Sequence, residues 1–185
     1  PRQVGSTMKP IGAYALALEK NKINWSTPLL DAPVRQLEDE KTGELKDWPA
    51  NFSKTYAEDD ILVVDALAQS INTIAVRVGE QAGVGNIYRF MKNSLGVTSL
   101  TPEDNDSGPM ILGSQTHGIS PYELAGAYMM LGNGGSFTTL HCYTSVQTGY
   151  GREIAAPELK TKQVLGTDTA YVMNRLLAQV DRKSV

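Results

Sequence analysis

A hydroxyl and an amine lie three residues apart near the start of the chain, in the stretch VGSTMKP at residues 4–10. If this stretch is helical, Ser6 and Lys9 are one turn apart on the same face. A serine hydroxyl becomes an effective nucleophile when a base takes its proton. Lys9 can be that base if burial or nearby positive charge lowers its pKa from about 10.4. The pair alone also fits a helix cap followed by a surface lysine.

A second pair with chemical potential lies in SINTIAV, residues 70–76. Ser70 and Asn72 are two residues apart, so in an extended turn both side chains face one cleft. Ser70 can relay a proton to a leaving amine, and Asn72 can hold a substrate amide through its paired donor and acceptor. The alternative is that both residues only cap a helix that begins at Thr73.

Taken together and in this order, the two pairs resemble the transpeptidase domain of the penicillin-binding proteins, particularly the bifunctional class A type. The resemblance is carried by GSTMKP, ALAQSINTIAV and GISPYELAGAYMMLGNGGSF, and it extends over nearly the whole chain. It implies that Ser6 is the nucleophile, Lys9 the base, Ser70 a proton relay and Asn72 a substrate contact. It implies no metal and no organic cofactor.

The reaction implied by the resemblance is acyl transfer in cell-wall cross-linking, by a serine-type D-Ala-D-Ala transpeptidase or carboxypeptidase. Ser6 would attack the carbonyl between the terminal D-alanines of a peptidoglycan stem peptide, and a second stem peptide's amine would resolve the ester. β-Lactam antibiotics would acylate the same serine. The site would face the extracytoplasmic side of the bacterial plasma membrane, held there only by an N-terminal anchor outside this chain.

The family's third motif, KTG, is expected after Ser70. Lys41, Thr42 and Gly43 spell it too early, where a turn with a glycine explains it. The stretch at 147–149 has Gln in place of Lys and runs into a hairpin turn. We therefore expect residues 1–185 to be a partial domain that lacks its first strands and its KTG strand. Such a piece would acylate poorly, because one lost oxyanion donor costs about 10²–10³ in rate.

Two other functions share these motifs. A serine β-lactamase of class A carries a glutamate that activates the deacylating water, and no convincing Glu-x-x-Leu-Asn stretch occurs here. A non-catalytic β-lactam sensor or scaffold would keep the pocket without turnover, and the sequence leaves that alternative open.

Composition limits the remaining classes. The chain has 185 residues, 41% of them hydrophobic, which is enough for one globular domain. A net charge of -3 argues against a nucleic-acid partner. Cys142 is the single cysteine and cannot form an intramolecular disulfide, and His117 and His141 are too few for a metal cluster.

Periodicity and capping signals predict a mixed α/β (α+β) fold of the β-lactamase/transpeptidase type, with a helical subdomain and part of an antiparallel sheet. Asp59 is expected to cap one helix, and Ser120 with Glu123 forms a capping box at the start of another. Residues 29–56 show little periodicity and are expected to form extended segments and loops, and residues 31–56 lie either at the rim of the cleft or outside it. A strand, a turn around 149–151 and a second strand are expected over 136–156. The expected helices cover residues 6–20, 59–70, 72–83, 85–96, 120–135 and 167–180.

Overall fold

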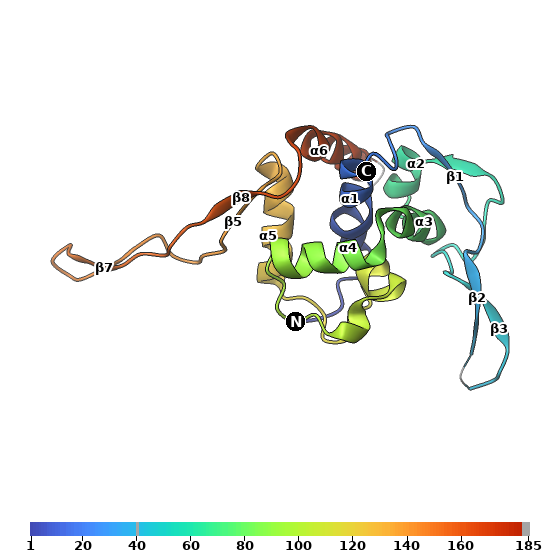
Figure 1. The fold of residues 1–185 in the computed structure, drawn as a ribbon, viewed down its shortest axis with the longest axis horizontal. Helices are drawn as coiled ribbons and strands as arrows, with labels where there is room; N and C mark the ends of the chain where they lie inside the picture. Colours follow the sequence, from blue (N-terminus) through green and yellow to red (C-terminus); the bar gives the residue numbers. More distant parts are fainter. Residues whose placement is uncertain (40, 183–185) are drawn as a thin grey trace.

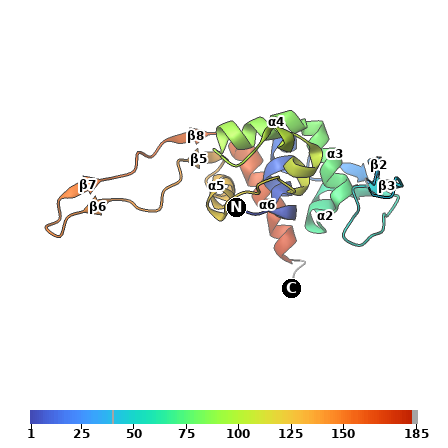
Figure 2. The same cartoon turned by 90° about the horizontal axis from the view of Figure 1, so that it is seen from below.

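The computed structural model describes residues 1–39 and 41–182, with side chains to residue 180. A compact group of helices carries two β-hairpins that point away from it on opposite sides (Figure 1). The longer excursion, which contains β6 and β7, leaves the body beside helix α5 (Figure 2). The mixed class of helices and small antiparallel sheets agrees with the expected fold.

The first helical run begins with two irregular segments. A 3₁₀ turn, η1 (Gly5–Thr7), leads into a π-helical segment, η2 (Pro10–Tyr14), and then into α1 (Ala15–Glu19). Pro10 lies at the start of η2, where its missing N–H costs no helical hydrogen bond. The remaining helical elements are α2 (Val63–Ala68), α3 (Asn72–Ala82), α4 (Val84–Arg89), η3 (Phe90–Ser94), η4 (Pro102–Asp104), η5 (Gly108–Leu112), α5 (Pro121–Gly132) and α6 (Thr167–Arg182).

The core forms around the first helical run, which lies among α3, η5 and α6 in Figure 1. Met8, Ile11 and Tyr14 are fully buried in it. Gly12 allows this run to approach η5, since a β-carbon there would lie 2.4 Å from the carbonyl oxygen of Met110. Among the described residues no helix is both long and apolar enough to cross a bilayer.

Within residues 1–39 and 41–182 the strands pair in four two-stranded antiparallel sheets. The partners are β1 (Pro28–Leu30) with β4 (Asp60–Leu62), β2 (Arg35–Glu38) with β3 (Leu45–Trp48), β5 (Ser136–Thr138) with β8 (Thr161–Gln163), and β6 (Val146–Gln147) with β7 (Glu153–Ala155). The predicted turn around 149–151 therefore joins β6 to β7. The prediction was wrong for β5, whose partner is β8.

One expected helix was wrong at its start, and two other local expectations agree with the structure. Asp59 does not cap a helix, because residues 60–62 form β4 opposite β1 and the helix starts only at Val63. The extended segments expected within residues 29–56 include β2 and β3, which pair with each other. The capping box was confirmed: Glu123 N donates to Ser120 Oγ at 3.2 Å, and Ser120 N donates to Glu123 Oε2 at 3.1 Å.

The β2–β3 hairpin is anchored to α3 where it leaves the body. Arg77 Nη2 donates to the carbonyl oxygens of Ala32 and Pro33 at 3.1 and 3.2 Å. Arg35, the first residue of β2, forms an ion pair with Glu80. Both contacts hold the base of the hairpin on the helix that begins at Asn72.

Candidate active site

Lys9 lies at the centre of the candidate site and is only 1% exposed. Its Nζ donates to Ser70 O at 2.6 Å, to Ser70 Oγ at 2.9 Å and to Asn72 Oδ1 at 2.6 Å. The structure therefore brings both sequence pairs together, although more than sixty residues separate them. The surface-lysine reading is wrong for Lys9.

Burial lowers the pKa of Lys9 from 10.5 to about 8, because the charged ammonium is poorly solvated there. In the described part of the chain no carboxylate forms an ion pair with it. An amine with this pKa is neutral in a useful fraction of molecules near neutral pH, as a general base requires.

Ser6 is exposed at the end of the buried run that contains Lys9. Gly5 precedes it with a φ of +56°, a left-handed conformation that suits glycine. Gly5 N donates to Gly113 O at 3.1 Å, and Tyr128 OH donates to Thr7 O at 2.7 Å, so the backbone is held on both sides of Ser6. Ser6 Oγ has no hydrogen-bond partner among the described residues.

Ser70 ends the turn that follows α2. Its φ is +57°, an uncommon left-handed value for a residue with a β-carbon. In this turn Ser70 N donates to Leu67 O at 3.0 Å and Ile71 N donates to Ala66 O at 2.9 Å. The result is that both the carbonyl and the hydroxyl of Ser70 face Lys9 Nζ.

Asn72 is the first residue of α3, and its amide is held from both ends. Oδ1 accepts from Lys9, while Nδ2 donates to Ala50 O at 2.6 Å. Neither Ser70 nor Asn72 caps α3 through its side chain. The capping interpretation of this pair is therefore wrong, and the first N–H groups of α3 bond to Asn51 instead.

A cavity of about 340 Å³ joins the exposed parts of the site. The sequence analysis did not predict Ala50, Asn51, Phe52 or Gln69 as lining residues. The only signal for the first three was their position in residues 31–56, which the sequence left open as a possible rim of the cleft. Within residues 31–56, residues 50–52 lie in the wall of this cavity. Phe52 is fully exposed beside the cavity. The lining residues are Ser6, Ala50, Asn51, Phe52, Gln69, Ser70 and Asn72.

Lys41, Thr42 and Gly43 form the turn between β2 and β3, as predicted for the early KTG. The Asp39 carboxylate accepts from Lys41 N at 2.9 Å and from Thr42 N at 3.2 Å. The three residues line none of the cavities described here and serve as a turn.

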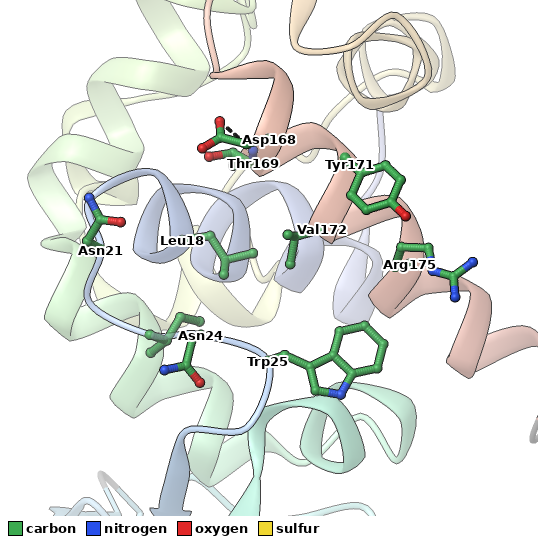
Figure 3. Close-up of a pocket in the computed structure, with 10 residues that line it drawn as sticks. Leu18, Asn21, Asn24, Trp25, Asp168, Thr169, Tyr171, Val172 and Arg175 are labelled. Atoms are coloured by element: carbon green, nitrogen blue, oxygen red, sulfur yellow. Dashed lines mark hydrogen bonds between the residues drawn. The ribbon is translucent and has the colours of Figure 1, made fainter.

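A larger cavity of about 560 Å³ lies between the segment after α1 and helix α6. Figure 3 shows Trp25, Tyr171 and Arg175 around it. It includes none of Ser6, Lys9, Ser70 and Asn72, so the candidate site is identified by its chemistry and not by cavity size. In the described ranges no group of three or more His, Cys, Asp or Glu side chains is arranged to hold a metal ion.

Penicillin-binding proteins of known structure share this arrangement of elements. The crystal structure of penicillin-binding protein 1A from Haemophilus influenzae superposes with a TM-score of 0.78 at 22% identity, over 97% of this chain and 30% of that one. An imipenem acyl-enzyme complex of penicillin-binding protein A from M. tuberculosis gives 0.75 at 18% identity, over 98% and 44%. The expected fold is therefore confirmed.

Sequence comparison also finds penicillin-binding proteins. Penicillin-binding protein 1B of Haemophilus influenzae is 30% identical over 171 residues, 92% of this chain and 21% of its own length. Penicillin-binding protein 1A of Clostridium botulinum is 26% identical over 176 residues, 95% of this chain and 21% of its own length. This chain thus spans about a fifth of these class A relatives. The model of the penicillin binding protein transpeptidase domain matches residues 1–184, and the chain belongs to that family.

Proposed function

We propose that this chain forms part of a bacterial peptidoglycan D,D-transpeptidase that works through a serine acyl-enzyme. The observation that carries the proposal is Lys9, a buried amine bonded to Ser70 and Asn72, one helical turn from the exposed Ser6. The family and the class A relatives support the reaction class. Since the chain spans about a fifth of those relatives, the active protein is taken to be longer than these residues.

In the first step, Ser6 Oγ attacks the carbonyl carbon between the two terminal D-alanines of a stem peptide. Neutral Lys9 takes the hydroxyl proton, and the C–O bond of the ester forms. As the C–N bond breaks, the departing D-alanine amine receives a proton through Ser70, which is bonded to Lys9. No metal or organic cofactor enters this sequence.

In the second step, an amine from another stem peptide attacks the ester carbonyl, and Ser6 recovers its proton. Water in place of that amine gives carboxypeptidase activity. Asn72 is proposed to bind the substrate amide with the part of its own amide that Lys9 and Ala50 leave free. The reaction belongs to the extracytoplasmic face of the plasma membrane, where stem peptides are.

β-Lactams are proposed to acylate Ser6 as mimics of the D-Ala-D-Ala terminus. Acyl-enzyme complexes of the neighbour from M. tuberculosis with imipenem and with penicillin G support this proposal. The same capture by a sensor would leave a stable adduct without peptide turnover.

The test uses the full-length protein that contains this segment, labelled penicillin and peptide mass analysis. An adduct on Ser6, lost in Ser6→Ala and kept in the exposed control Ser26→Ala, together with release of D-alanine from a stem-peptide mimic, is the expected result. Rapid hydrolysis of penicillin would indicate a β-lactamase, and an adduct without peptide turnover would indicate a sensor. Absence of any adduct would overturn the proposal.

A further inference from the structure

Helix α3 is capped by a side chain from another part of the chain. Its preceding residue, Ile71, offers no side-chain acceptor, and the first N–H groups of a helix have no partner within it. Asn51 Oδ1 accepts from Asn72 N at 3.0 Å and from Thr73 N at 3.4 Å. The acceptor that starts α3 therefore comes from the segment that follows β3.

The amide of Asn51 is buried, with 8% exposure, and uses its full hydrogen-bonding capacity. Its Nδ2 donates to Asp31 Oδ1 at 2.8 Å and to Thr55 O at 3.1 Å. A reversed amide would set Nδ2 against two N–H donors and Oδ1 against two oxygen acceptors. Asp31 thus determines which end of Asn51 faces α3.

Asp31 is the fixed point of this arrangement. It is 4% exposed, and its carboxylate also accepts from Thr73 Oγ1 and, at 2.9 Å, from Ala57 N. Burial alone would raise the pKa of Asp31, but hydrogen bonds from Thr73, Ala57 and Asn51, with the nearby Arg77 charge, hold it below the ordinary value. The carboxylate therefore remains charged and ties the 51–57 segment to α3.

The same segment reaches the catalytic lysine through Asn72. Ala50 O accepts from Asn72 Nδ2, Asn51 Oδ1 accepts from Asn72 N, and Asn72 Oδ1 accepts from Lys9. We propose that Asn51, oriented by Asp31, is a positioning residue for acyl transfer that fixes Asn72 and, through it, the amine of Lys9. This inference rests on the proposed function.

Substitutions at Asn51 separate positioning from simple capping. Asn51→Asp keeps a good acceptor for the first N–H groups of α3, but sets a second carboxylate against Asp31. Capping alone predicts nearly unchanged acylation for Asn51→Asp. Positioning predicts slower acylation in both Asn51→Asp and Asn51→Ala. It predicts partial recovery of the acylation rate in the double variant Asn51→Asp/Asp31→Asn, where an amide donor at position 31 faces a carboxylate acceptor at position 51.

The experiment measures acylation of the full-length protein by fluorescent penicillin, resolved into a binding constant and a first-order acylation constant. Asn51→Ala should lower the acylation constant about 100-fold, the order expected for displaced catalytic groups, with little change in binding. Ser120→Ala, which removes the cap of α5 away from the site, is the matched control and should keep the wild-type constants. An isotope label on Lys9 should show a higher titration midpoint in Asn51→Ala, because a loosened site admits water.

The outcomes distinguish the two proposals. If Ser6 is acylated at the wild-type rate in folded Asn51→Ala and Asn51→Asp, with an unchanged Lys9 midpoint, the positioning role is wrong and the proposed function stands. If the wild type forms no adduct, the proposed function fails, and the Lys9 titration alone decides. A shifted midpoint would then show only that Asn51 fixes the amine of Lys9, without a role in acyl transfer, and an unchanged midpoint would overturn that contact as well.

Discussion

Lys9 Nζ lies 2.9 Å from Ser70 Oγ, and this is the hydrogen bond of Lys9 that can reverse its direction. The other two acceptors are the Ser70 carbonyl and the Asn72 amide oxygen, which only accept. Once the amine is neutral, its lone pair needs a donor, and among these partners only the Ser70 hydroxyl provides one. Ser70 is thereby coupled to the proton that Lys9 gains and loses.

The acylation rate should rise with pH through about 8. In the proposed mechanism only the neutral form of Lys9 takes a proton from Ser6, and burial lowers the pKa of Lys9 to about 8. The measurement is the first-order acylation constant of the full-length protein with fluorescent penicillin between pH 6 and pH 10. Lys9→Met should lose about 10²–10⁴ in this constant and the pH dependence with it. A flat profile in the wild type would contradict the assignment of Lys9 as base.

Deprotonation of Lys9 should also stabilise the fold at high pH. Because the folded pKa lies below the unfolded one, both states hold the proton below pH 8 and the cost of burying the charge is fully present. Between about 8 and 10.5 the unfolded chain binds the extra proton, so the free energy of unfolding rises with pH. The gap between the two values corresponds to about 3 kcal/mol. In denaturant unfolding, the free energy of unfolding of the wild type should rise relative to that of Lys9→Met between pH 8 and pH 10.5. The same pH dependence in both proteins would refute this prediction.

Two substitutions of Ser70 should separate the effect of its hydroxyl on acylation from the effect of its left-handed backbone on stability. Ser70→Ala and Ser70→Gly both remove the hydroxyl, so each should lower acylation about 100-fold. Only glycine relieves the left-handed φ of +57°, and Ser70→Gly should be about 1 kcal/mol more stable than Ser70→Ala. Acylation and thermal unfolding of both variants test this. Wild-type acylation in either variant would exclude Ser70 from proton transfer.

Gly113 should be essential to the position of Ser6. A β-carbon at Gly113 would lie 2.2 Å from Gly5 O and 2.5 Å from Gly5 N. Gly113→Ala should therefore shift the backbone beside Ser6, the proposed nucleophile, lower acylation, and cost about 1–3 kcal/mol more than a strain-only control. That control is Gly96→Ala, where φ is +67° and nothing lies within 4 Å. Equal stability and equal acylation in the two variants would show that the contact is unimportant.

Patterns between residues close in sequence, such as helical spacing and capping boxes, predicted local structure correctly where no distant strand intervened. The one-turn spacing of Ser6 and Lys9 placed both on the first helical run, and the capping box of Ser120 and Glu123 marked the start of α5. The helix expected from Asp59 begins only at Val63. Acidic residues at 59 and 60 are typical of a helix start, and this local pattern is the same whether or not Asp60–Leu62 pairs with a distant strand. Pairing with β1 overrode that preference.

The supporting residues of the site were not predictable in the same way. Asn51 and Asp31 act on residues 21 and 42 positions away, and neither belongs to a periodic or capping pattern of its own. Their stretch contains several prolines and little periodicity, so the sequence offers no local reason to choose one polar residue over another. Burial and hydrogen-bond accounting single them out once the fold is known.

The hairpin of β2 and β3 leaves the body and returns to it on the same helix (Figure 1). Arg77 and Glu80 secure its departing strand, and Asn51 meets the N-terminus of α3 after its return. Lengthening or shortening the excursion between these attachment points leaves both of them in place. Because both attachment points lie outside the turn at residues 41–43, an insertion or a label placed in that turn should leave the contacts of Arg77 and Asn51 with the rest of the body unchanged.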